Sequence, residues 1–245
     1  MKRLILILLI FSPFGILNAQ ERMLTLGIQY KPIFASRFFG AGEITTKDDA
    51  LEASITPTWG HSYGMIIRRG FTKMISYEGG ISYVKRRYAI NCTDVDSGFS
   101  SPSDFSLVSY EIPNQMLIYI QLGERLYMNT AFGISLIAFA SDVQSFATDR
   151  RFYHFSQLTT NFLSAALIAN VGFEYRTKKS GFFYFGASFH NPVKDITRSY
   201  IEYSKDNFST YRADFGLRGT YLTLDFRYFF HEAPIREQKN RTKKT

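Results

Sequence analysis

The last apolar segment of the chain, residues 220–230, alternates between apolar and polar side chains. One face carries Leu222, Leu224, Phe226, Tyr228 and Phe230, and the other carries Thr223, Asp225 and Arg227. Because successive side chains of a β-strand point to opposite faces, one face can meet lipid while the other meets a polar interior. The pattern is therefore typical of a transmembrane β-strand.

The same alternation recurs through the chain and predicts eight strands. They span residues 23–34, 58–69, 74–88, 105–122, 125–138, 163–176, 181–191 and 220–230. Each reaches the length of about 9 to 11 residues that a tilted strand needs to cross a bilayer. The connections between them are alternately long and short, which indicates an up-and-down meander with its tight turns at one end.

These features predict an all-β fold, namely an eight-stranded up-and-down antiparallel transmembrane β-barrel. In such barrels the short turns face the periplasm and the long loops face outside, and an even number of strands leaves both termini periplasmic. We therefore expect the protein in the outer membrane of a Gram-negative bacterium, in contact with outer-membrane lipid. Loops at about 141–161 and 192–219 are rich in Tyr, Phe, Arg and Asp, a composition suited to recognition surfaces.

A soluble eight-stranded barrel of the lipocalin type is the main alternative, because alternation does not say which face points inward. The polar faces of six strands carry a glycine, at Gly27, Gly64, Gly80, Gly133, Gly172 and Gly186. A narrow interior favours glycine on the inner face, whereas the opposite faces are too bulky to fit inside. Aromatic residues near strand ends predict interfacial girdles, at Tyr30, Phe34, Tyr63, Tyr88, Tyr175, Phe183 and Tyr228.

The N-terminus predicts an export signal. Lys2 and Arg3 precede an apolar run, and Ala19 offers a small residue for cleavage. An uncleaved membrane anchor is the alternative, but the run is shorter than the roughly 20 apolar residues that a spanning helix needs. We therefore expect a signal peptide at 1–19, the barrel at 20–230 and a basic periplasmic tail at 231–245, which we expect to be disordered.

The formal net charge is +8, and much of the excess lies in this tail. Nucleic acid is not expected as a partner, because no aromatic platform, helix-turn-helix or zinc pattern accompanies the basic residues. Cys92 is the single cysteine, so no intramolecular disulfide can form.

Six charged side chains are expected to point into the periplasmic half of the barrel. They are Arg68, Glu78, Glu174, Arg176, Asp225 and Arg227. Isolated charges are costly in a desolvated interior, so these residues should pair as a structural lumen charge network. A proton or ion path is the functional alternative. Eight strands leave an interior just wide enough for side chains, which favours a plug.

Catalytic chemistry is weakly indicated. His190 and Ser188 share the inner face of one strand, but the sequence places no carboxylate to orient the imidazole. The Asp48–Asp49 pair and the pair of Asp94 and Asp96 lack the rest of an EF-hand loop. We therefore expect no enzyme activity, no cofactor, no catalytic or cofactor-binding residues and no metal site.

Two segments resemble the outer-membrane β-barrel domain family of Bacteroidota. Residues 64–83 are similar to the family's second hairpin, and Tyr110-Glu-Ile-Pro113 is similar to the Leu-Glu-Ile-Pro-Leu opening of its fourth strand, with Tyr110 and Asn114 at positions where leucine is usual. The resemblance implies the barrel fold and supplies no catalytic residues. One branch of the family, the PorT proteins, is implicated in type IX secretion.

The leading hypothesis is a non-enzymatic, porin-like outer-membrane barrel with a plugged lumen and a structural or surface-recognition role. The alternative is an accessory subunit of a secretion or transport machine, as the PorT-like resemblance implies. That alternative requires a periplasmic or outer-membrane protein partner.

Overall fold

The computed structural model describes residues 24–34, 42–48, 51–146, 152–158, 163–204 and 210–231. Every regular element in these residues is a β-strand, and the sheets are antiparallel, so the all-β prediction is confirmed. Within this part of the chain, no helix has the length and apolar character of a membrane-spanning helix. The predicted signal peptide and residues 232–245 of the predicted tail lie outside the described residues.

There are thirteen strands in the described residues. Their bounds are β1 Leu24–Phe34, β2 Ile44–Asp48, β3 Leu51–Gly70, β4 Ile75–Asp94, β5 Ser100–Gln121, β6 Leu126–Phe139, β7 Val143–Phe146, β8 Phe152–Leu158, β9 Leu163–Arg176, β10 Phe182–Pro192, β11 Thr197–Ser204, β12 Thr210–Leu217 and β13 Tyr221–Phe229. The eight predicted segments correspond to β1, β3, β4, β5, β6, β9, β10 and β13.

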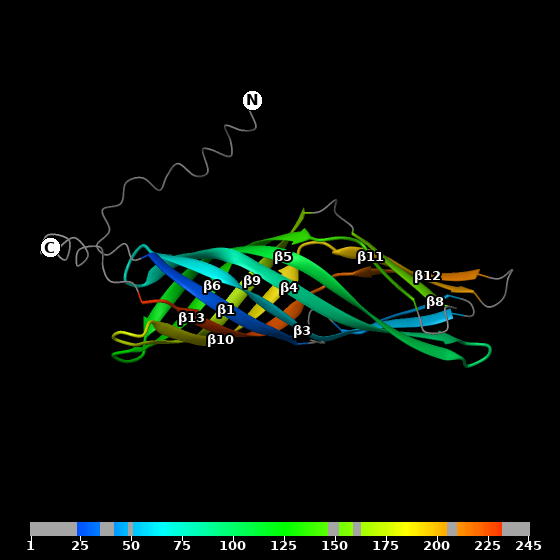
Figure 1. Cartoon of the computed structure of the whole chain (residues 1–245), viewed down its shortest axis with the longest axis horizontal. Coiled ribbons are helices and arrows are strands. Elements are labelled where there is room, and N and C mark those ends of the chain that lie inside the picture. Colours follow the sequence, from blue (N-terminus) through cyan, green and yellow to red (C-terminus); the bar gives the residue numbers. More distant parts are fainter. Residues whose placement is uncertain are drawn as a thin grey trace, which may run out of the picture.

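These eight strands are joined in a ring of pairings. One sheet has the order β1-β13-β10-β9-β6-β5-β4-β3-β2, and β1 also pairs with β3. Ile28 thus faces Tyr228 of β13 on one side and Met65 of β3 on the other. Figure 1 shows the ring at one end of an elongated molecule, with β8, β11 and β12 at the other end.

The three short turns, the start of β1 and the end of β13 all lie at the same end of the ring, which we call the turn end. The turns connect β3 to β4, β5 to β6 and β9 to β10. Leu24 pairs with Arg69, next to the first of these turns, and Gly27 pairs with Phe229. Gly181 closes the third turn with a positive φ of 82°, a conformation that glycine adopts without steric cost.

The prediction of eight strands was too low for the chain, because the predicted long loops contain further strands. β7 and β8 lie within the loop predicted at 141–161, and β11 and β12 within that at 192–219. They form a second sheet of order β12-β11-β8-β7. β3, β4 and β5 also run well past their predicted ends, since β4 continues to Asp94.

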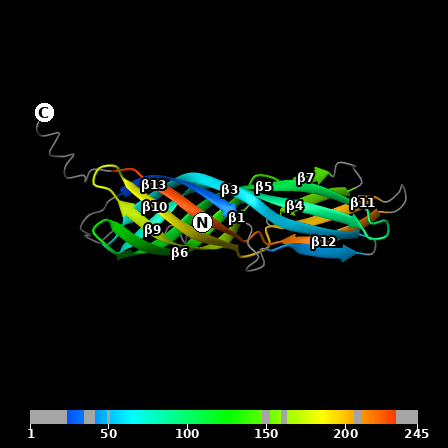
Figure 2. The same cartoon turned by 90° about the horizontal axis from the view of Figure 1, so that it is seen from below.

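We call the part beyond the ring the extension: β2, the distal parts of β3, β4 and β5, and the sheet of β7, β8, β11 and β12. Figure 2 shows these strands continuing from the ring along the long axis of the molecule. An apolar core fills the extension and includes Leu51, Ile90, Phe105, Phe152 and Tyr203.

The polarity of the inward and outward side chains reverses along the strands that run from ring to extension. On β4, inward side chains near the turn end are polar, such as Glu78, whereas those in the extension are apolar, such as Ile90. The outward side chains change the other way, from Ile81, which is 51% exposed, to Arg87. The ring is therefore apolar outside and polar inside, and the extension has the opposite arrangement.

This reversal corrects one predicted girdle residue. Tyr88 is only 3% exposed and stacks on Phe105, with ring centroids 5.1 Å apart, so it belongs to the core of the extension. Tyr30, Tyr63, Tyr175 and Phe183 are about half exposed on the outer surface of the ring.

β3 contains a β-bulge at the point where the polarity of its faces reverses. The register between β3 and β4 shifts between Thr58 and His61. Odd-numbered residues such as Ile55 are buried before the shift, and even-numbered ones such as Arg68 after it. An extra residue in one strand exchanges the faces of all following side chains. The bulge therefore turns the apolar set of β3 inward in the extension and outward in the ring.

Candidate functional site

The six predicted lumen residues all lie inside the ring. Arg68 comes from β3, Glu78 from β4, Glu174 and Arg176 from β9, and Asp225 and Arg227 from β13. Each occupies the inward parity of its strand, which is the parity that alternation assigns to the polar face. Five of them are at most 5% exposed, and Arg176, nearest the turn end, keeps 33% of its side chain exposed.

The six side chains form one connected set of ion pairs. Glu78 accepts hydrogen bonds from Arg68 Nη2 at 2.9 Å and from Arg227 Nη1 at 2.5 Å. Glu174 accepts hydrogen bonds from Arg68 and from Arg176 Nε, the latter at 2.7 Å. Arg227 Nη2 also donates to Asp225 Oδ2 at 2.5 Å. Buried charges are tolerated when each is paired and hydrogen-bonded, and this arrangement meets that condition.

A seventh member, Lys31 of β1, was not predicted. Its Nζ lies 3.2 Å from Asp225 Oδ2, and the side chain is buried. Lys31 shares the inward parity of Gln29, so the alternation of β1 is sufficient to predict that Lys31 points inward. We refer to these seven residues as the charge network. It holds the four cations Lys31, Arg68, Arg176 and Arg227 against three carboxylates.

Neutral side chains complete the hydrogen bonding of the carboxylates. Gln115 Nε2 donates to Glu78 Oε1 at 2.6 Å. Asp225 accepts from the hydroxyls of Ser188 and Thr223, at 2.5 and 2.6 Å. Charge-assisted hydrogen bonds of this kind are stronger than neutral ones. The network is therefore continuous across the interior of the ring and is linked to the neutral side chains around it.

Aromatic rings close the interior on the side of the short turns. The guanidinium carbon of Arg68 lies 3.7 Å from the ring centroid of Phe229, and that of Arg176 lies 4.1 Å from the centroid of Tyr127. Leu117 and Tyr119 are buried beside them. Together with the charge network, these side chains fill the ring.

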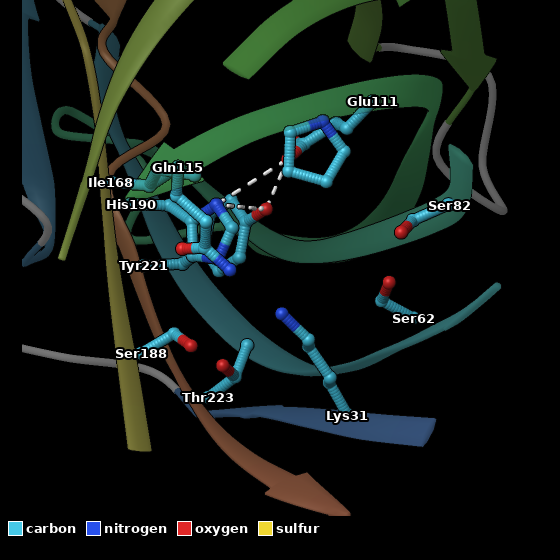
Figure 3. Close-up of a pocket in the computed structure, with 11 residues that line it drawn as sticks. Lys31, Ser62, Ser82, Glu111, Gln115, Ile168, Ser188, His190, Tyr221 and Thr223 are labelled. Carbon is cyan, nitrogen blue, oxygen red and sulfur yellow. Dashed lines mark hydrogen bonds and ion pairs between the residues drawn. The ribbon is translucent and has the colours of Figure 1, made fainter. Parts of the chain in front are cut away.

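A small cavity lies next to the network, toward the extension (Figure 3). Its volume is about 10 Å³, which is the space that one water molecule needs. Lys31, Ser62, Ser82 and Thr223 line one side of it, and His190 and Tyr221 line another. A space of this size is too small to form a pore.

Glu111, His190 and Tyr221 form a buried cluster at this cavity. His190 Nδ1 lies 3.3 Å from Glu111 Oε2, and the Tyr221 hydroxyl donates to Glu111 Oε1 at 2.8 Å. The rings of His190 and Tyr221 stack with centroids 4.4 Å apart. Glu111 is the carboxylate that the sequence could not assign to His190, because the two residues lie on β5 and β10, which do not pair.

Ser188 is hydrogen-bonded to residues other than His190. Its hydroxyl donates to Asp225, and it accepts a hydrogen bond from Asn170 Nδ2 at 2.8 Å. Among the described residues no hydrogen bond joins Ser188 to His190, so the pair lacks the contact through which a base activates a serine.

Asp94 caps a turn between β4 and β5. Its carboxylate accepts from the Ser97 hydroxyl at 2.7 Å, the Tyr203 hydroxyl at 2.9 Å and the backbone N–H of Asp96 at 3.0 Å. These hydrogen bonds, led by that from Ser97, lower the pKa of Asp94 to about 2. The described residues contain no group of three His, Cys, Asp or Glu side chains placed to hold a metal ion. Asp49 lies outside them.

A second candidate site is the solvent face of the sheet of β7, β8, β11 and β12. Four aromatic side chains gather there, namely Phe146, Tyr153, Phe155 and Tyr200. Neighbouring ring centroids lie 5.0 Å apart for Phe146 and Tyr153, 6.2 Å for Tyr153 and Tyr200, and 5.4 Å for Phe155 and Tyr200. Phe146 is 62% exposed. We call these four residues the aromatic face.

Arg212 borders the aromatic face and is held in place. Its guanidinium carbon lies 4.0 Å from the ring centroid of Tyr200, and its Nη2 donates to Asp214 Oδ1 at 2.9 Å. Tyrosine, phenylalanine and arginine are enriched in protein interfaces. The sequence indicated this composition in the two loops, but not the sheet that arranges it.

The protein has the fold of an outer-membrane β-barrel protein. Its structure is similar to the outer membrane protein OprG from Pseudomonas aeruginosa, with a TM-score of 0.53 and 13% sequence identity over 87% of this chain and 99% of that chain. The β-domain of the Bordetella autotransporter BrkA and the translocator domain of NalP from Neisseria meningitidis give TM-scores of 0.22 and 0.21, too low to indicate a shared fold. The sequence matches no protein-family model and no curated protein.

Proposed function

We propose that this chain is a non-enzymatic integral outer-membrane β-barrel protein whose eight-stranded ring crosses the membrane and holds the extension outside the cell for recognition. The observation that carries this proposal is the reversal of polarity along β4 and β5, whose outward side chains are apolar on the ring and polar in the extension. Apolar side chains such as Ile81, Ile112 and Met116 are about half exposed on the ring, where water would disfavour them and lipid would accommodate them.

The connections support the orientation that we propose. Short turns face the periplasm in outer-membrane barrels. The ends of β1 and β13 lie at the same end as the short turns, which supports an orientation with the first strand starting and the last strand ending on the periplasmic side and the extension outside the cell.

The filled interior supports a role other than conduction. The charge network, the aromatic rings beneath it and the apolar core of the extension lie one after another along the axis of the molecule. We therefore assign the charge network a structural role and the aromatic face the recognition role.

Heat modifiability and topology test this proposal. Folded protein in detergent should migrate differently before and after boiling, and protease added to intact cells should cleave the extension while sparing the ring. Planar bilayers containing the protein should show no large open channel. Recovery of the protein in the soluble fraction, or a stable open channel, would refute the proposal.

The accessory-subunit alternative is distinguished by affinity purification. The protein would be extracted in mild detergent from the native outer membrane and its co-purifying proteins identified by mass spectrometry. A reproducible stoichiometric partner that is lost on substitution of the periplasmic turns would favour the accessory role in secretion. A partner lost on substitution of Tyr200 would favour recognition by the aromatic face.

A further inference from the structure

The outer surface of β3, β4 and β5 changes character in a fixed order at the end of the apolar band. On β4 the outward side chains run from Ile81 to Tyr83 and then to Lys85 and Arg87. Aromatic residues of membrane proteins sit at the level of the lipid headgroups. The two cations therefore follow at the level where the headgroups meet water.

A ladder of rings marks this level. The rings of Tyr63 and Tyr83 stack with centroids 4.9 Å apart, and Tyr110 meets Tyr83 edge-on at 5.9 Å. His61 stacks over Tyr63 at 6.2 Å and is the cross-strand partner of Lys85. The imidazole thus lies beside the cations and extends the ladder toward water.

The two cations, Lys85 and Arg87, differ from the other arginine on the surface of the extension that was described above. In the described part of the chain neither Lys85 nor Arg87 forms an ion pair, although Asp104 lies on the neighbouring strand, opposite Ala89. By contrast, Arg212 in the extension is paired with Asp214. Two adjacent cations directly beyond an apolar and aromatic surface are complementary to an anionic headgroup with acyl chains below it.

We propose that Lys85 and Arg87, with His61, bind the phosphate group of a phosphorylated lipid in the outer leaflet. Its acyl chains would lie along Ile81 and its neighbours on the ring. The apolar surface that continues below the cations selects a lipid over free phosphate, because only a lipid contacts both. This inference rests on the proposed membrane orientation.

The test uses the full-length protein in bilayers of phosphatidylcholine with either bisphosphorylated or dephosphorylated lipid A. Trp59, the single tryptophan of the chain, is 65% exposed on β3 close to His61, so its fluorescence reports on this surface. Native mass spectrometry of detergent-extracted protein would count the bound lipids. We expect retention of bisphosphorylated lipid A, less of the dephosphorylated form, and no Trp59 response to inorganic phosphate alone.

The double variant Lys85→Gln/Arg87→Gln should weaken binding of bisphosphorylated lipid A about 30-fold, at about 1 kcal/mol for each basic side chain near a membrane surface. Lys47→Gln, which removes an exposed lysine of β2 in the extension, should leave this binding unchanged. Equal retention by the double variant, or no effect of the lipid phosphate, would overturn the inference. Failure of the wild-type protein to insert into any bilayer would instead refute the proposed function.

Discussion

Replacing Glu78 with alanine tests whether the charge network holds the ring together. Glu78 accepts hydrogen bonds from Arg68 Nε and Nη2 at 3.2 and 2.9 Å, from Gln115 at 2.6 Å and from Arg227 at 2.5 Å. Its removal leaves four cations of the network facing two carboxylates, since Glu174 and Asp225 remain.

Removing one partner of a buried ion pair costs roughly 3 to 5 kcal/mol, because the opposite charge stays buried without compensation. We therefore expect Glu78→Ala to lower the free energy of unfolding by an amount in this range. Glu78→Gln keeps the volume and one acceptor oxygen, so its cost should be smaller, about 1.5 to 3 kcal/mol. Glu124→Ala, in an exposed turn, is the matched control and should stay within about 0.5 kcal/mol of wild type.

The assay is urea-induced unfolding in lipid vesicles, followed by Trp59 fluorescence and by the mobility of unheated samples on gels. Conductance in planar bilayers would be measured for the same variants and should stay negligible, because Leu117, Tyr119 and Phe229 still fill the ring. A loss of stability below about 1 kcal/mol for Glu78→Ala would refute a structural role for the network. A large open channel with unchanged stability would show that Glu78 blocks an ion path through the ring.

Three further predictions concern other parts of the molecule. Gly186→Val should destabilise the ring by about 1 to 3 kcal/mol in the same urea assay, because a Cβ there would lie 2.5 Å from the carbonyl oxygen of Val171; a neutral effect would contradict this packing. Burial lowers the pKa of His154 in the extension to about 4, so this residue's stabilisation is complete above the unfolded pKa of about 6.5 and is lost as the pH falls toward 4, by at most about 3 kcal/mol. Protease resistance of the extension should follow that pH dependence in wild type, and His154→Gln should flatten it. Tyr203→Phe removes a hydrogen bond to Asp94 and should speed cleavage of the extension without changing heat modifiability; a loss of heat modifiability would show that the extension and ring unfold together.

The interior of the ring was largely predictable from sequence. A period of two assigns each polar side chain to one face, which is sufficient to turn Asp225 and Arg227 inward on β13. Lys31 follows from the same rule on β1. The link between Glu111 and His190 does not, since it spans strands that are not paired and depends on the register of every strand between them.

The extension was missed for a different physical reason. Alternation reports which residues share a face but not what that face meets. On β11, Tyr200 points outward and Tyr203 inward, so aromatic residues on both faces hide the period. On β4 the alternation continues without a break while its polarity reverses, and Tyr88 was therefore assigned to a membrane girdle.

The reversal also bears on where the proposed recognition would take place. On β4 the outward apolar and aromatic residues run from Ile75 to Tyr83, which at about 3.3 Å per residue and a tilt of about 40° corresponds to roughly 20 Å of height, close to the apolar band of about 25 Å in such barrels. The strand then continues to Asp94, which by the same geometry carries the extension roughly 30 Å further. An apolar core fills the extension, so the extension continues the wall of the ring as a packed unit. With the proposed membrane position, a partner bound at the aromatic face would stay clear of the lipid headgroups, and the proposed lipid site at Lys85 and the aromatic face could be occupied at the same time.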